Sequence, residues 1–339
     1  MIRMTAPDDF HVHLRRAPLL EPVVRETARW FARVLVMPNV DPPVTTVERL
    51  RAYRDEIRSA VPAGRSLEPL MTFKVIPEIR PEEVARLAAA GAIGGKLYPR
   101  GVTTNSQDGA DRIEDLYPVL EAMEQAELVL EVHAEAPDAF SLDREAAYIP
   151  TIERIVSRYP RLRVVIEHVS CAATIDRLDD LPPTVAATVT LHHLLLTLDD
   201  VVGDTLRPHH FCKPIAKHPA DREALRAAVF SGNPRVFFGS DSAPHPRGAK
   251  ESDCGCAGVY TAPVAIPMLA GIFAEAGLPV PSMESFVSDY GARFYRLPRN
   301  ETTITLIERE WSVPDCYGDV VPFGARAGLR YDVSDGGEA

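Results

Sequence analysis

Eight short apolar segments constrain the fold of this chain more than any other feature of its sequence. They are rich in β-branched residues and cover residues 10–15, 33–39, 67–75, 92–99, 128–133, 162–168, 185–191 and 235–241. Segments typical of helices lie among them, over residues 47–60, 81–90, 112–127, 143–159 and 221–230. Strands that alternate with helices form parallel βαβ units, and eight such units close into a barrel. We therefore predict an α/β fold, a single (β/α)8 TIM-type barrel domain over residues 1–339, with about residues 297–339 as a C-terminal extension packed on it.

Polar residues lie at the ends of several of these segments. His11 and His13 are separated by one residue, so their side chains project from the same face of a strand. His133, His168 and Asp241 close the fifth, sixth and eighth segments, and the carboxyl ends of barrel strands meet at one rim, where active sites are built. Four imidazoles and a carboxylate suit Zn²⁺ or a similar ion. Because these are too many ligands for one catalytic zinc with an open position, two ions are expected.

Lys96, near the end of the fourth segment, has a chemical explanation in this setting. Only five of the 37 basic residues are lysine, so a lysine within a core strand is unusual in this chain. Burial and neighbouring cations both disfavour the ammonium form and favour the neutral amine. A neutral amine can add CO₂ and become a carbamate, an anionic group with two oxygens that can bridge two ions. The alternative is a buried lysine paired with an acidic residue.

The composition limits the classes of partner and the cellular location. The net charge of −11 argues against nucleic acid or an anionic membrane as a partner. No apolar run reaches the ~18 residues of a membrane span. The first residues lack the apolar core of a signal peptide, so a cytoplasmic protein is expected. Cys254 and Cys256 resemble a zinc pair, but no second cysteine pair follows at ligand spacing, and we interpret them as part of a tight loop.

The sequence resembles the dihydroorotases of the amidohydrolase superfamily, in their short bacterial form, over nearly the whole chain. The resemblance lies in these motifs: His11-Val12-His13-Leu14-Arg15, Val36-Met37-Pro38-Asn39, Lys96-Leu97-Tyr98-Pro99, Thr103-Thr104-Asn105-Ser106, Glu131-Val132-His133, Glu167-His168, Gly239-Ser240-Asp241-Ser242-Ala243-Pro244-His245 and Cys254-Gly255-Cys256-Ala257-Gly258. The first marks only the superfamily, whereas the Thr103 and Cys254 motifs are much more specific.

The resemblance implies a binuclear zinc centre and a reaction. His11, His13, Asp241 and the carbamate of Lys96 would hold one zinc, and the carbamate, His133 and His168 the other, with a hydroxide bridging the two ions. The implied reaction interconverts N-carbamoyl-L-aspartate and L-dihydroorotate in pyrimidine synthesis. Asp241 would be the catalytic residue that moves the proton from the attacking oxygen to the departing nitrogen.

The same resemblance implies how a small anionic substrate is bound. Arg15, two residues beyond His13, would present its guanidinium to the substrate carboxylate. Further contacts are implied for Asn39, Thr103, Thr104, Lys213, His245 and Ala257. Lys213 stands where relatives often carry leucine, and the family contact there is mainly through the backbone. The polar loop 100–111 would carry both threonines over the site, and it offers almost nothing apolar to anchor it.

Two other functions stay open at this point. A hydrolase for hydantoins or allantoin would share the metal ligands but would not need Arg15, Asn39 and His245 around a carboxylate. A catalytically dead barrel that serves as an assembly partner should have lost ligands. The histidine doublets at 192–193 and 209–210 are interpreted as structural. The family also suggests a homodimer.

Overall fold

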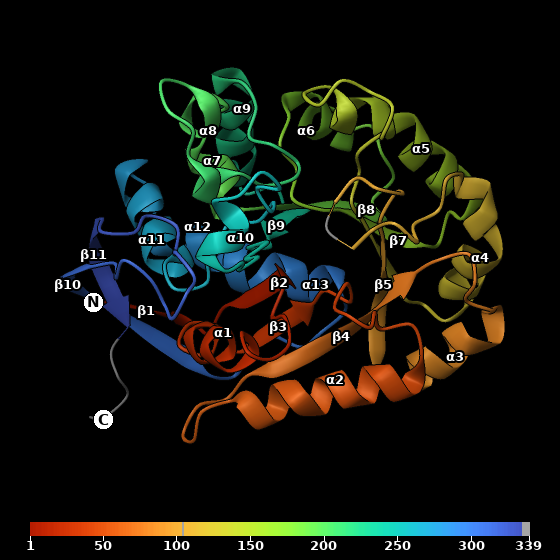
Figure 1. Ribbon diagram of the computed structural model, residues 1–339, viewed down its shortest axis with the longest axis horizontal. Helices are drawn as coiled ribbons and strands as arrows, with labels where there is room; N and C mark the ends of the chain where they lie inside the picture. The colour runs from red at the N-terminus through yellow and green to blue at the C-terminus, as the bar shows by residue number, and fades with distance from the viewer. Residues whose placement is uncertain (104, 334–339) are drawn as a thin grey trace.

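The computed structural model describes residues 1–103 and 105–333 and confirms the predicted barrel (Figure 1). One sheet holds eight strands that pair in sequence order, each parallel to the next. These strands are β2 (Asp8–Val12), β3 (Arg33–Val36), β4 (Glu68–Val75), β5 (Ala92–Leu97), β6 (Val129–Val132), β7 (Arg163–Ile166), β8 (Val185–Val189) and β9 (Val236–Phe238). The sheet closes beyond the end of β9, where the Asp241 amide donates to the His11 carbonyl at 2.8 Å and the His13 amide donates to the Ser242 carbonyl at 3.0 Å.

Helices surround this sheet, as Figure 1 shows. They are α1 (Leu20–Thr27), α2 (Val47–Ala60), α3 (Pro81–Ala89), α4 (Tyr117–Gln125), α5 (Arg144–Arg158), α6 (Ala172–Leu178), α7 (Leu191–Leu195), α8 (Asp199–Val202), α9 (Pro219–Phe230), α10 (Arg247–Lys250), α11 (Ala265–Glu275), α12 (Val280–Glu284) and α13 (Tyr290–Phe294). α2 shows how the local sequence determines a helix. Thr46 caps its first turn by accepting from the Arg49 amide, and Leu50, Tyr53 and Ile57 form its buried face.

A separate apolar cluster fills the barrel interior away from the predicted rim. Side chains from the strands meet α13 and the residue that follows it, and the cluster comprises Phe10, Leu35, Met37, Leu70, Val129, Val165, Ala186, Phe237, Ala292 and Tyr295. The rings of Phe10 and Tyr295 stack with their centroids 4.9 Å apart. Gly291 permits this approach, because a Cβ at that position would lie 2.3 Å from the Phe10 ring. This end of the barrel is therefore packed, and a ligand site belongs at the opposite end.

A second, antiparallel sheet joins the two ends of the described chain. Its strands are β1 (Ile2–Thr5), β10 (Thr303–Ser312) and β11 (Gly328–Val333), with β10 in the centre. The sequence indicated the C-terminal appendage but gave no sign that the first residues would pair with it. The division of the chain into a barrel and an extension from about residue 297 stays a prediction. Within residues 1–103 and 105–333, no helix has the length and apolar character needed to cross a membrane.

Candidate functional site

His11, His13 and Asp241 converge at the rim of the barrel. Nε2 of His11 lies 3.4 Å from Oδ1 of Asp241, and Nε2 of His13 lies 3.2 Å from the same oxygen. All three residues are buried, and one potential ligand atom from each lies within 4.8 Å of the others. The strands end earlier than the sequence predicted, since β9 stops at Phe238 and β7 at Ile166. Asp241 and His168 then adopt positive φ angles of 43° and 41°, which L-residues rarely adopt, so the chain leaves the strand geometry before each of these side chains.

Carboxylates behind the histidines fix the orientation of two rings. Nδ1 of His11 donates to Oε2 of Glu167 at 2.8 Å, and the same oxygen accepts from the Thr188 hydroxyl at 2.5 Å. Nε2 of His133 donates to Oε2 of Glu135 at 2.6 Å. Each pairing leaves the other ring nitrogen with a lone pair, which is the arrangement found around histidines that bind metals.

The pKa values of Glu167, His13 and His168 agree with an ionised carboxylate and with neutral imidazoles in this cluster. Burial acts to raise the pKa of Glu167, but the facing His11 and Lys96 outweigh it and hold the pKa below its ordinary value. Burial and the neighbouring positive groups keep the pKa values of His13 and His168 well below the usual range. These imidazoles are therefore neutral at pH 7, so their lone pairs are available to a metal ion.

Lys96 lies beside this cluster in an unusual state for a lysine. Its side chain is fully buried at the end of β5, and Nζ makes no hydrogen bond to any residue within the described ranges. Burial, opposed in part by Glu167, Glu131 and Asp241, lowers the pKa of Lys96 to about 8. Among the described residues, no hydrogen bond joins this nitrogen to an acidic side chain, although Glu167, Glu131 and Asp241 act on it electrostatically.

His133 and His168 lie next to the first group of ligands. Their ring centroids are 4.7 Å apart, and the His168 ring lies 5.0 Å from that of His11. The His168 amide donates to the Thr188 hydroxyl at 2.7 Å, while Nδ1 of its ring has no hydrogen-bond partner among the described residues. A buried amine and a buried ring nitrogen, both without hydrogen-bond partners among the described residues, are typical of a site that binds cations. They also fit a lysine that is chemically modified.

A small cavity opens above these groups. Its walls contain most of the residues predicted from the sequence, together with some that were not, and the complete set is His11, His13, Arg15, Asn39, Tyr98, Thr103, His133, His168, Lys213, Asp241, Ala243, Ala257 and Gly258. Lys96 and His245 are not among these wall residues. Thr104 lies outside the described residues. Tyr98, another wall residue, was not among the predicted contacts, although it lies two positions beyond Lys96 and the spacing along the strand could have indicated it.

Arg15 lies in the cavity wall and is held by its neighbours. Its φ is 61°, Nε donates to the Pro244 carbonyl at 3.0 Å, and Nη2 donates to Nε2 of His245 at 2.9 Å. Burial and the adjacent Arg15 lower the pKa of His245 to about 3, so this ring is a neutral acceptor. The Ala257 carbonyl oxygen lies 3.0 Å from the same ring nitrogen, which can donate to that oxygen only in the tautomer that does not accept from Arg15. The guanidinium is therefore a fixed positive charge at the edge of the cluster.

The loop 100–111 is anchored more firmly than the sequence indicated. Val102 and Ser106 are buried. Nζ of Lys74, on β4, donates to the Asn105 carbonyl at 2.6 Å and contacts the Asp108 carboxylate. The Asn105 amide group donates to the Asn39 carbonyl at 3.0 Å. Polar contacts from a buried lysine on β4 therefore anchor this loop, in addition to the little apolar surface that the sequence offered.

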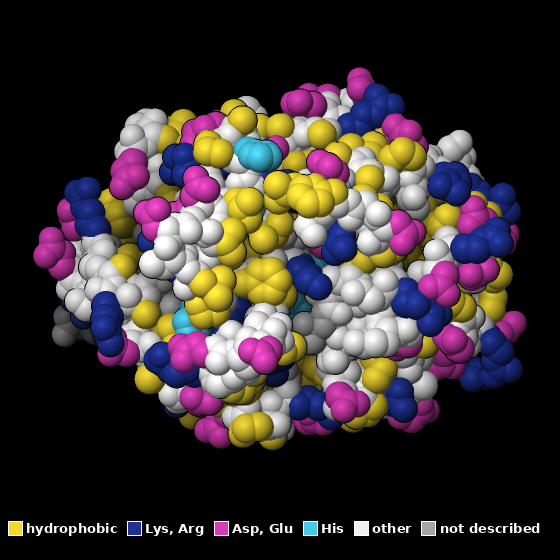
Figure 2. All heavy atoms as spheres, turned by 45° about the horizontal axis from the view of Figure 1, so that its top comes forward, with side chains coloured by type: hydrophobic (Ala, Val, Ile, Leu, Met, Phe, Trp, Pro, Cys, Tyr) yellow, Lys and Arg dark blue, Asp and Glu magenta, His cyan; other side chains and the backbone are white. Residues whose placement is uncertain are grey.

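The remaining motifs divide into two kinds. Cys254 and Cys256 have their sulfurs 3.8 Å apart, and no further His, Cys, Asp or Glu among the described residues completes a ligand set with them. His192 and His193, in contrast, are buried together with Cys212 in a group that could hold a metal ion. Acidic and basic side chains are interspersed over the face of the molecule that Figure 2 shows.

Comparisons with known proteins agree with this geometry. The model of the amidohydrolase family matches residues 8–304. A dihydroorotase of Azoarcus is 47% identical over 319 residues, which are 92% of each chain. The crystal structure of a Campylobacter jejuni dihydroorotase superposes with a TM-score of 0.91 at 39% identity, over 98% of this chain and 97% of that one. A Saccharomyces cerevisiae dihydroorotase in complex with 5-fluoroorotic acid gives 0.92 at 33% identity, over 98% of both chains.

The barrel, its ring of potential metal ligands and these relatives lead to one conclusion: the chain is a hydrolase acting on cyclic amides and belongs to the dihydroorotases of the amidohydrolase family.

Proposed function

We propose that this chain interconverts N-carbamoyl-L-aspartate and L-dihydroorotate in pyrimidine synthesis. The observation that carries the proposal is the position of Arg15, a half-buried guanidinium in the wall of the same cavity that His11, His13 and Asp241 line. A cluster of metal ligands alone suits any cyclic amide. A fixed cation beside it favours a ring that carries a carboxylate. The names of the relatives support the same reaction.

Two zinc ions and a carbamate on Lys96 fit the residues present. His11, His13 and Asp241 would hold one ion, His133 and His168 the other, and the modified Lys96 would bridge them. The support is the buried Nζ without a hydrogen-bond partner among the described residues, together with imidazoles that are oriented by Glu167 and Glu135. When bound, such ions polarise a carbonyl and make water a stronger nucleophile at neutral pH.

The residues around the cavity account for the binding of an anionic ring. Arg15 would donate to the carboxylate, and His245 holds that guanidinium in place at 2.9 Å. Asn39, Thr103 and Ala257 also lie in the cavity wall and would offer polar groups to the ring. Lys213 is another residue of the wall. Thr104 is proposed as a contact only by the resemblance. The yeast relative was crystallised with 5-fluoroorotic acid, a ligand of the same chemical class.

Asp241 is placed to move the proton. In the hydrolytic direction a water oxygen bonds to the ring amide carbon, the carbon–nitrogen bond breaks, and one proton passes from that oxygen to the departing nitrogen. Asp241 lies in the cavity wall and reaches both His11 and His13. Burial raises its pKa, although the facing histidines and Lys96 oppose this effect.

A comparison of substrates tests the proposal. The purified chain, with its zinc content measured, is assayed on dihydroorotate, hydantoin and allantoin. The proposed function predicts turnover of dihydroorotate and little conversion of the rings that lack a carboxylate. A preference for hydantoin or allantoin would assign the chain to the rival hydrolase. A zinc-loaded chain inactive on every ring would support a catalytically dead barrel. Homodimer formation and a cytoplasmic location are further proposals, based on the family resemblance.

A further inference from the structure

His192 has an arrangement that packing alone does not explain. It lies in α7, directly after β8, and its side chain is fully buried. Neither Nδ1 nor Nε2 has a hydrogen-bond partner among the residues that the structure describes. A neutral imidazole always carries one N–H donor and one acceptor nitrogen, so burial without partners leaves both unsatisfied. Such a group calls for a ligand.

Two further ligand types surround this histidine. The ring of His193 lies 4.5 Å from that of His192, between centroids. Sγ of Cys212 lies 3.8 Å from Nε2 of His193. One potential ligand atom from each of the three residues lies within 4.8 Å of the others, and all three side chains are buried. Two nitrogens and one sulfur therefore converge at a point that the proposed reaction does not use.

The distances suit a single ion of a particular class. Nitrogen and sulfur atoms bound to one tetrahedral zinc, at about 2.0 Å and about 2.3 Å, are roughly 3.5 Å apart. The separation of 3.8 Å between Sγ and Nε2 is close to this value. Imidazole and thiolate favour Zn²⁺, Co²⁺ and Cd²⁺, whereas Mg²⁺ and Ca²⁺ prefer oxygen ligands.

We propose that His192, His193 and Cys212 form a metal site for one thiophilic divalent ion, distinct from the two ions at the barrel rim. Binding forms a metal–sulfur bond and releases the Cys212 thiol proton to solvent. Without an ion, Sγ lies 3.2 Å and Nε2 of His193 lies 3.0 Å from the Pro214 carbonyl oxygen, which accepts from both. Nδ1 of His193 lies 2.9 Å from the Thr190 hydroxyl, which can accept the ring proton once Nε2 binds the ion.

Burial keeps the unbound site neutral. It raises the pKa of Cys212 to about 12 and lowers the pKa of His193 to about 4, so the thiol stays protonated and the imidazole uncharged at pH 7.

The position of the site gives it a consequence for the cavity. Cys212 is followed by Lys213, which lies in the cavity wall. An ion at Cys212 therefore fixes the chain segment that carries Lys213. These three side chains take no part in the proposed reaction, so the metal site is independent of it.

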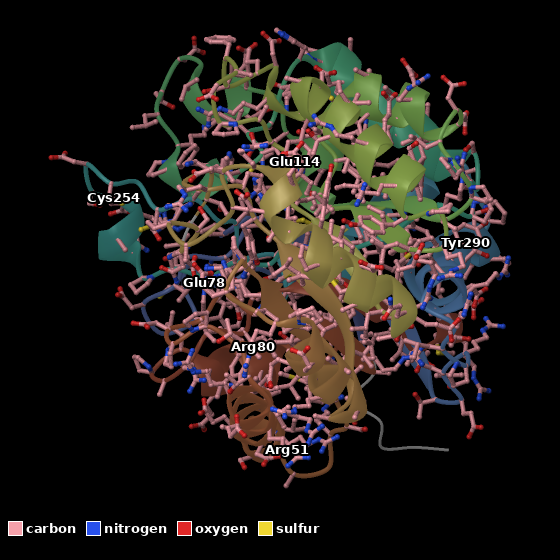
Figure 3. The ribbon with its side chains drawn as sticks, turned by 90° about the vertical axis from the view of Figure 1, so that its right-hand side faces the viewer. Arg51, Glu78, Arg80, Glu114, Cys254 and Tyr290 are labelled. Carbon is pink, nitrogen blue, oxygen red and sulfur yellow. The ribbon has the colours of Figure 1, made fainter. Side chains whose placement is uncertain are left out.

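Cobalt provides a test because its bond to sulfur has a spectroscopic signature. The chain has five cysteines, and none of the predicted active-site ligands is a thiol. Cys254 and Cys316 are exposed and Cys256 is half-buried, and Cys254 lies at the outer edge of the molecule in Figure 3. Replacing these three with serine gives a background protein that retains only Cys171 and Cys212.

The background protein, expressed with Co²⁺, should show a near-ultraviolet thiolate-to-cobalt charge-transfer band. Adding Cys212→Ser, which keeps a hydroxyl donor for Pro214, should abolish the band and lower the cobalt content by one ion per chain. Adding Cys171→Ser instead should leave the band unchanged, since Cys171 contacts Glu145 and Thr174. His192→Gln should weaken cobalt binding at this site at least tenfold.

Two results would overturn the proposal. One is the absence of the band from a folded background protein. The other is a band that survives Cys212→Ser or is unaffected by His192→Gln. Melting curves check that each variant is folded, and if Cys212→Ser does not fold, the cobalt titration of His192→Gln decides the question. Dihydroorotate turnover is not part of the readout, so failure here is distinguishable from failure of the proposed function.

Discussion

At the scale of single residues, Asp241 combines more roles in this account than any other side chain. It lies within 3.4 Å of two histidine nitrogens and in the wall of the cavity. Asp241→Ala removes a ligand and the proposed proton carrier together, so turnover of dihydroorotate should fall by at least about 10²–10⁴-fold even with zinc restored. Asp253→Ala, at an exposed position nearby in the sequence, is the control. Near-normal turnover by Asp241→Ala would refute the mechanism.

Substitutions of Lys96 distinguish a carbamate at this position from an ordinary lysine. Lys96→Ala should lose most activity and zinc, and short carboxylic acids should restore part of both by supplying the missing oxygens. Lys96→Arg should not be restored, because a guanidinium stays protonated and repels the ions. Kinetics and metal analysis of both variants check this. A metal-loaded crystal with a bare amine at residue 96 would contradict the prediction.

Arg15 sets the specificity in this account. A charged hydrogen bond is worth roughly 1.5–3 kcal/mol, so Arg15→Met should raise KM for dihydroorotate by roughly 10- to 100-fold. Any weak turnover of uncharged cyclic amides should hardly change. Arg16→Met removes a neighbouring arginine that pairs with Glu56, and it serves as the control. Equal losses on both kinds of ring would mean that Arg15 supports the fold or the metal ligands instead.

These residues could be predicted from the sequence because their residue types alone indicate their chemistry. Histidines at strand ends and a rare lysine within a strand indicate metal chemistry without any coordinates. The orienting partners Glu167 and Glu135 could not be assigned, since both lie next to or near a ligand in the sequence and their direction depends on the local turn. The left-handed φ of Asp241 was equally hidden, because periodicity describes only regular backbone.

At the scale of elements, the loop 100–111 shows how one lysine changes an interpretation. Lys74 and Lys96 are neighbours in register on β4 and β5, yet one is paired and the other is not. Lys74 binds the Asn105 carbonyl and Asp108 from below the loop, which an analysis of the loop's own composition could not reveal. The strand order, in contrast, follows directly from the alternation of helices and strands.

The clamp that Lys74 forms on this loop, through the Asn105 carbonyl and Asp108, has a measurable consequence. Asp108→Asn weakens the contact with Lys74 at a position that is partly exposed, so kcat/KM for dihydroorotate should fall by a few-fold to about tenfold. Lys74→Met should cost more. Zinc content should not change in either variant. Asp111→Asn, which breaks the exposed pair with Arg100 at the edge of the same loop, is the matched control. If Asp108→Asn and its control behave alike, the clamp has no part in catalysis.

At the scale of the whole molecule, the barrel was predictable and its edge was not. Eight repeated βα units leave few alternatives to a closed barrel. Residues Ile2–Thr5, in contrast, pair with residues about 300 positions away, in register with Thr303 to Leu306. Four residues carry no periodicity that could indicate such a pairing. The apolar cluster around Phe10 and Tyr295 fills one end of the barrel. The predicted metal ligands lie at the opposite rim.

The central claim is that this barrel is a metal-dependent enzyme for dihydroorotate. The most direct test follows ring closure of N-carbamoyl-L-aspartate by the intact chain as purified, after removal of metal by a chelator, and after zinc is added back. The account predicts a loss of at least about a hundredfold on metal removal, recovery as zinc is restored, and no comparable conversion of hydantoin in any state. An undiminished rate without metal, or a zinc-restored chain that prefers hydantoin, would contradict it.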